Sequence, residues 1–237
     1  MAENRGAVVT VAHQVEVHRL AVAGREASIA REVGSQVAAT WLRTSRFAEV
    51  EALTTETLRL GPDADAFYSR GWARSATGRA SQALNDYGQA LALYRQKGSS
   101  GNEAATLSNI GLSLNELGDP RQALAHFQQA LPIARAVGDR AGEATALSNI
   151  GSLYNRLGDR QQALAYCQEA LPIQREVGDR VGEATTQFNI AMVHLAQGRL
   201  DQAINELERA VELERQVSHP DLAADTALLE RLRRHLH

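Results

Sequence analysis

Few side chains in this sequence stand at spacings that would let them act together as a catalytic or metal site. The single cysteine, Cys167, lies in an apolar helical pattern, so we expect a small core residue and no intrachain disulfide. His13 and His18 are five residues apart, which places them on different sides of a helix and makes them poor joint metal ligands. The sequence contains no phosphate-binding loop, nucleophile elbow or zinc spacing. We therefore expect no enzyme activity, no bound metal and no cofactor.

Charged residues recur at the junctions between similar segments. Asp139, Arg140 and Glu143 form one group, and the same three residue types recur forty positions later. We expect helix caps and surface ion pairs here, each worth about 0.5 kcal/mol, rather than catalytic groups.

Asparagines at a fixed spacing suggest a binding chemistry instead. The string SNIG occurs twice and FNIA once, so that Asn109, Asn149 and Asn189 stand forty residues apart. A side-chain amide both donates and accepts hydrogen bonds. A row of such amides would pair with the N–H and C=O groups of an extended peptide without reading its side chains. Alternatively, the amides hydrogen-bond between adjacent helices and set their stacking, and the two roles are compatible.

The composition indicates a helical protein with a core. Of the 237 residues, 44% are apolar, 22% are charged and only 5% are aromatic, a balance that favours helix. The formal net charge is −3 without long blocks of one sign, which argues against a nucleic-acid partner. One cysteine fits a reducing compartment, and the apolar start lacks the uninterrupted core of a signal peptide. Because no run approaches the roughly 20 apolar residues of a membrane helix, we expect a cytoplasmic protein.

A repeat of 40 residues organises most of the chain. Of the 40 positions in 101–140, 25 are identical in 141–180. One column reads Gly71, Gly111 and Gly151, followed by Ala191, and a second glycine column and two alanine columns keep the same spacing. Self-similarity at such a period is typical of stacked structural repeats.

Each repeat is expected to contain two helices. In one copy the first runs from about Ala104 to Leu117 and ends at Gly118, which reaches the left-handed conformation at no steric cost. Asp119 then caps a second helix that ends near Val137. The small residues of the columns are expected where two helix backbones approach closely.

The apolar and small positions of one copy are Leu107, Ile110, Gly111, Leu114, Ala123, Phe127 and Ala130. This pattern closely resembles the tetratricopeptide repeat (TPR). The resemblance covers about residues 35–217, and the 40-residue period is similar to the long-period subclass of Pins-type adaptors, kinesin light chains and bacterial signalling-ATPase sensor regions. Pro132 and Pro172 depart from the family pattern, because they lie inside the second helix, where we expect a kink or a local opening.

The resemblance implies an all-α fold, a right-handed α-solenoid of stacked antiparallel helix pairs. We expect a degenerate N-terminal segment over 1–34, in which Leu20–Val33 is the second helix of an earlier unit. For residues 1–19, the valines favour a strand, whereas continuity with the helices that follow favours a helix. We expect a helix. A capping helix is expected over 218–237. The array itself spans 35–217, with units at about 35–62, 63–98, 102–138, 142–178 and 182–217.

In such an array the first helices line a concave groove. Tyr68 and Trp72 would offer an apolar anchor there, or would pack against the preceding unit. The expected groove residues are Asn109, Asn149, Asn189, Ser69, Trp72, Leu112, Glu116, Ser152, Arg156 and Met192.

The expected function is a non-catalytic protein–protein interaction scaffold that binds an extended peptide or a partner helix in this groove. An alternative is a sensor or regulatory arm of a larger signalling NTPase, and an enzyme with dispersed residues is a third reading. We expect a protein or peptide partner and neither nucleic acid nor membrane. A weak homo-oligomer through the exposed N-terminal helix is compatible with the sequence.

Overall fold

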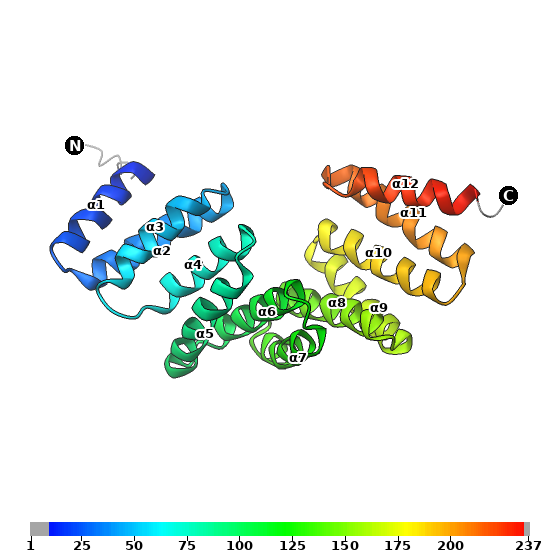
Figure 1. Ribbon diagram of the computed structural model, residues 1–237, viewed down its shortest axis with the longest axis horizontal. Coiled ribbons are helices and arrows are strands. Elements are labelled where there is room, and N and C mark those ends of the chain that lie inside the picture. Colours follow the sequence, from blue (N-terminus) through cyan, green and yellow to red (C-terminus); the bar gives the residue numbers. More distant parts are fainter. Residues whose placement is uncertain (1–9, 235–237) are drawn as a thin grey trace, which may run out of the picture. The chain divides into compact units, whose positions relative to one another are not determined.

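The computed structural model describes residues 10–234, and its regular secondary structure over that range is entirely α-helical. The all-α fold class expected from the sequence is thereby confirmed, and Figure 1 labels the helices along the chain. Their bounds are α1 (Val11–Ala23), α2 (Ala27–Arg43), α3 (Phe47–Leu58), α4 (Ala64–Ala76), α5 (Ala80–Lys97), α6 (Ser100–Glu116), α7 (Pro120–Val137), α8 (Arg140–Leu157), α9 (Arg160–Val177), α10 (Arg180–Ala196), α11 (Leu200–Val217) and α12 (Leu222–Arg234).

The chain forms two compact units. Of the described residues, the first unit contains 10–102 together with Leu112–Leu117, and the second contains Glu103–Gly111 and 118–234. In the first unit α2 contacts α1, α3 and α4, and α4 contacts α5. In the second unit successive helices from α7 to α12 contact one another, and α8 also contacts α10. Short turns make neighbouring helices antiparallel, as Figure 1 shows for α10 and α11.

The helix ends follow the turn chemistry of the sequence. Gly118 ends α6 with a φ of +83°, a conformation that glycine adopts without steric cost. The Asp119 side chain accepts a hydrogen bond from the Gln122 backbone N–H at 3.0 Å and so caps α7. These residues therefore fix where one helix of the hairpin stops and the next begins.

The two internal prolines do not open their helices. Both α7 and α9 continue as α-helix through Pro132 and Pro172, so of the two expected effects, a kink or a local opening, the opening is wrong. Both prolines are exposed, and the carbonyl that Pro132 leaves without an intrahelical donor belongs to Gln128, which is also exposed. Water can therefore solvate that carbonyl, which limits the cost of the missing hydrogen bond.

The column glycines allow close packing within each helix hairpin. A Cβ placed on Gly111 would lie 2.7 Å from the Phe127 ring, and one on Gly71 would lie 2.8 Å from the Tyr87 ring. Both aromatic side chains are fully buried. A side chain at the glycine position would therefore force the two helices apart.

The helices at the N-terminal end begin and end at residues other than the expected ones. The expected helix Leu20–Val33 is wrong, because α1 ends at Ala23 and α2 begins only at Ala27. Residues 1–9 of the stretch for which helix was favoured lie outside the described residues. The string REVG occurs twice and led to the wrong helix. It lies at the end of α9 but in the middle of α2. In α2, Gly34 packs closely against α1, and a Cβ on it would lie 3.1 Å from the His18 ring.

Candidate peptide-binding groove

A cavity of about 310 Å³ in the second unit brings several of the expected groove residues together. We call it the α8–α10 groove, because most of its walls come from those two helices. Three of the predicted site residues, Asn149, Ser152 and Asn189, line it. The complete lining is Thr145, Ser148, Asn149, Ser152, Gln174, Asp179, Val181, Gly182, Thr185 and Asn189.

The two asparagines are half-buried in the walls of the α8–α10 groove. Asn149 Nδ2 donates a hydrogen bond to the Thr145 backbone oxygen at 2.9 Å, one turn earlier in the same helix. This bond holds the side chain in place and leaves Oδ1 and the second N–H of Nδ2 for another partner. Because the bond is made within α8, Asn149 does not connect α8 to the next helix through it.

Other residues of the α8–α10 groove connect the helices. Ser148 Oγ lies 2.7 Å from Thr186 Oγ1, and Gln174 Nε2 donates to the same Thr186 hydroxyl at 2.9 Å. All three side chains are buried, so this small network ties α8, α9 and α10 together. The hydroxyl of SNIG, rather than its amide, therefore makes the contact between helices here.

Most residues that line the α8–α10 groove have polar but uncharged side chains. Asp179 is the one ionisable residue among the lining residues, and its carboxylate accepts the Gly182 N–H at 2.8 Å as the cap of α10. Val181 at the edge has an exposed side chain. Hydroxyl and amide groups of this kind suit the neutral N–H and C=O groups of a peptide backbone better than a charged ligand.

The acidic residues at the repeat junctions are more deeply buried than expected. Glu143 is buried, although we expected a surface pair, and it accepts hydrogen bonds from Arg135 at 2.8 Å and Arg140 at 2.6 Å. Burial alone would raise the pKa of Glu143, but the two arginine hydrogen bonds outweigh it and lower that pKa. Glu183 is buried in the same way between Arg175 and Arg180. Each glutamate joins the end of one helix pair to the start of the next.

The remaining groove candidates of the second unit lie elsewhere. Asn109 is half-buried on α6, and Arg156 is exposed near the end of α8. Met192 packs against the apolar cluster that α10 and α11 form with α12. The α8–α10 groove therefore gathers only part of the residues that the asparagine pattern suggested.

Four candidates belong to the first unit. Ser69 is buried, whereas Leu112 and Glu116 are exposed. Trp72 keeps 43% of its surface exposed, with Tyr68 at a ring-centroid distance of 6.4 Å. Tyr68 also contacts the rings of Tyr87 and Tyr94, at centroid distances of 5.9 and 6.4 Å. Of the two aromatic residues, Tyr68 is thus packed into its own unit and Trp72 remains available to solvent.

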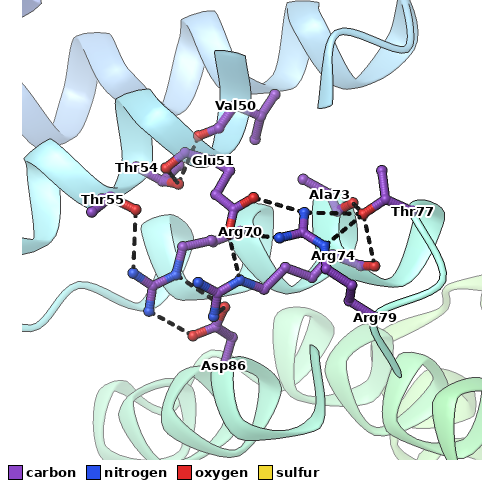
Figure 2. Close-up of polar contacts among 10 residues, drawn as sticks. All are labelled: Val50, Glu51, Thr54, Thr55, Arg70, Ala73, Arg74, Thr77, Arg79 and Asp86. Carbon is purple, nitrogen blue, oxygen red and sulfur yellow. Dashed lines mark hydrogen bonds and ion pairs between the residues drawn. The ribbon is translucent and has the colours of Figure 1, made fainter. Parts of the chain in front are cut away.

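A buried ion-pair network in the first unit was missed at the sequence level. Figure 2 shows Asp86 between two arginines of α4, with hydrogen bonds of 2.7 Å from Arg70 and 2.9 Å from Arg74. Arg74 also donates to Glu51 of α3 at 2.9 Å, and Arg79 donates to the same carboxylate at 2.7 Å. The network therefore joins α3, α4 and α5 through charged groups, and Asp86 is 2% exposed.

The repeat alignment contained a signal for this network. The positions forty residues after Arg70 and Arg74 are Ile110 and Leu114, so two apolar columns become charged in one unit. Arginine at an apolar column needs a buried acid nearby, which Asp86 supplies.

The comparisons with known proteins agree with this architecture. The family model of the tetratricopeptide repeat matches residues 63–136, 102–163 and 142–216. Because these matches cover more than half of the chain, the protein belongs to the tetratricopeptide repeat family, as the columns indicated. No curated protein matches the sequence significantly.

Solved structures share the fold at low sequence identity. BtubC from P. vanneervenii is 19% identical with a TM-score of 0.69, over 88% of this chain and 92% of that one. The apo form of the quorum sensor NprR from B. thuringiensis is 18% identical with a TM-score of 0.68, over 94% of this chain and 69% of that one. YrrB, described as a TPR protein with an unusual peptide-binding site, is 15% identical with a TM-score of 0.61, over 91% and 99% of the two chains. These similarities establish the fold alone.

No helix within 10–234 combines the length and the apolar character that crossing a membrane requires. In the same part of the chain, no three His, Cys, Asp or Glu side chains group in a way that would hold a metal ion.

Proposed function

We propose that this protein is a non-catalytic interaction scaffold that binds an extended peptide segment of a partner in the α8–α10 groove. The observation that carries the proposal is the convergence of Asn149 and Asn189 in one cavity whose lining residues are mostly polar and uncharged. The descriptions of two similar structures mention peptide binding. YrrB is described with an unusual peptide-binding site, and NprR was solved in complex with its cognate peptide NprX.

The amides would act on the peptide backbone. Asn149 offers Oδ1 and one N–H after its internal bond to Thr145, and Asn189 from α10 faces the same cavity. Together they would supply the donors and acceptors that one extended peptide unit requires. The hydroxyl groups of Ser152 and Thr185 extend the polar lining along both helices. The partner's side chains would then contribute specificity outside this clamp.

The test begins with a peptide selected from a display library against the purified full-length protein. Its affinity is measured by fluorescence anisotropy for the wild type and for the double variant Asn149→Ala, Asn189→Ala. Loss of two hydrogen-bonding side chains at about 1 kcal/mol each is expected to raise the Kd roughly 30-fold. A peptide methylated on its backbone nitrogens should lose affinity for the wild type.

The matched control is Asn205→Ala, which removes an exposed asparagine from α11 outside the α8–α10 groove. It should leave the Kd unchanged, and circular dichroism should show the same helix content for all variants. If the double variant binds the selected peptide as tightly as the wild type does, the asparagines are not the clamp and the proposal is wrong.

A further inference from the structure

One carboxylate stands among the otherwise uncharged lining of the α8–α10 groove. Asp179 immediately precedes α10, is half-buried and lines the cavity, so part of its side chain faces the space that a peptide would occupy. One of its oxygens accepts the Gly182 N–H at 2.8 Å. Because a carboxylate has about four acceptor positions, most of its capacity to accept hydrogen bonds remains for a ligand.

Asp179 has no counter-ion within the described part of the chain. The arginines nearest to it in sequence, Arg175 and Arg180, both donate to Glu183 instead. The side chains of both arginines are more than half exposed, so water and salt screen the charge that this pairing leaves. None of the other residues that line the α8–α10 groove is basic. The groove therefore offers a ligand one negative charge and no positive charge.

The second unit as a whole carries charge of the same sign. Its sequence, 103–111 together with the residues from 118 onward, contains seventeen acidic and thirteen basic residues. The resulting formal net charge, with neutral histidines, is −4, whereas that of the whole chain is −3. A field of this sign attracts a positively charged partner and disfavours an acidic one.

The position of Asp179 relative to the asparagines sets a register for the peptide. Asn189 follows Asp179 by ten residues, which corresponds to about 15 Å along α10 at a rise of about 1.5 Å per residue. An extended peptide advances about 3.3 Å per residue. In a peptide that follows α10, a side chain beside Asp179 would therefore come from a residue about four to five positions away from the backbone unit held by Asn189.

We infer that the peptide bound in the α8–α10 groove carries a lysine or arginine whose side chain pairs with Asp179. The inference rests on the proposed function, because it names the chemistry of the partner at the same site. Asn149 and Asn189 hold the peptide backbone, whereas Asp179 distinguishes one peptide from another by charge. An acidic residue at the same position would face the carboxylate and be rejected.

The test selects peptides from one random display library in parallel against the full-length wild type, Asp179→Asn and Asp159→Asn. Asparagine caps a helix as well as aspartate does, so Asp179→Asn keeps the cap of α10 and removes the charge. Asp159→Asn is the matched control, because Asp159 caps α9 through the Gln162 N–H at 3.1 Å and lies outside the lining. Wild type and control should select peptides that share a basic residue at one position, and Asp179→Asn should not.

A thermodynamic cycle then measures the pairing. One peptide selected by the wild type is synthesised with both termini blocked, together with a counterpart in which glutamine replaces the shared basic residue. In fluorescence anisotropy at low salt, Asp179→Asn should raise the Kd of the basic peptide roughly fivefold and that of the glutamine peptide less than twofold. The fivefold effect should shrink as salt is added, and Asp159→Asn should change neither Kd by more than twofold.

The inference is overturned if the peptides selected by the wild type share no basic residue, or if Asp179→Asn changes the two Kd values by the same factor. Either result leaves the backbone clamp to be judged by the double variant Asn149→Ala, Asn189→Ala, so the two proposals can fail separately. Failure of the wild type to select any peptide would overturn both.

Discussion

Replacing Glu214 by glutamine should change how the stability of the C-terminal helices depends on pH. Glu214 of α11 is 2% exposed and Asp225 of α12 is 9% exposed, so two carboxyl groups are buried at one helix interface. Burial, a hydrogen bond with Asp225 and the nearby charge of Asp221 raise the pKa of Glu214 to about 7. The pair is therefore stable when it holds a proton and unfavourable when both groups ionise.

The sign and the magnitude follow from this pKa. A folded-state pKa above the unfolded value of 4.5 means that the stabilisation is fully present below pH 4.5 and is lost as pH rises through about 7. A rise of the Glu214 pKa from 4.5 to about 7 corresponds to at most about 3–4 kcal/mol of unfolding free energy. Glu214→Gln keeps a hydrogen-bonding side chain without this titration. Relative to wild type it should become progressively more stable between about pH 5 and about pH 8.

Urea unfolding followed by circular dichroism at several pH values measures this difference. Subtracting wild type from variant at each pH cancels the titration of groups that do not interact with Glu214, so the difference reports on the Glu214–Asp225 pair. The control is Glu212→Gln, an exposed residue on the same helix that pairs with Arg215, and its difference should be flat. A flat difference for Glu214→Gln as well would refute the shared-proton explanation of the α11–α12 interface.

Three further predictions concern the core. Gly111→Ala should destabilise the protein by about 1–3 kcal/mol in urea unfolding, because the new Cβ meets the Phe127 ring, whereas Gly88→Ala meets nothing within 4 Å and should be neutral or stabilising. Asp86→Ala should cost about 3–5 kcal/mol, because two partly buried arginines lose their acid; a cost below about 1 kcal/mol would mean that water replaces the carboxylate. Burial raises the pKa of Cys167 to about 12, so a thiol reagent should react with it only after denaturation, and rapid labelling of the folded protein would contradict its burial.

Much of the fold was predictable because repeats constrain one another. Four copies of the same columns fixed the helix pairs, and Gly118 and Asp119 marked a helix boundary by their backbone and capping preferences. The first 34 residues have no second copy to align with, and a short matching string led to the wrong helix. The role of Gly34 in close helix packing depends on its contacts with His18 and Thr57, which only the structure shows.

The candidate site was predictable in part for the same reason. Helical spacing placed Asn149, Ser152 and Asn189 on one face, and the structure brings them into one cavity. Periodicity does not reveal which side-chain atoms a neighbouring helix will engage, so the role of Ser148 in joining α8 to α10 was missed.

The pairing of each column glycine with a buried side chain on the following helix has a consequence for recombining these repeats. Gly71 faces Tyr87 and Gly111 faces Phe127, so the volume removed from one helix is occupied by the next. In the following hairpin Gly151 faces Cys167, with the Ala163 carbonyl 3.0 Å from where a Cβ would stand. A chimaera that exchanges one helix between hairpins would leave either a void or a clash. The hairpin as a whole is therefore the smallest module that can be shuffled, duplicated or averaged into a consensus design.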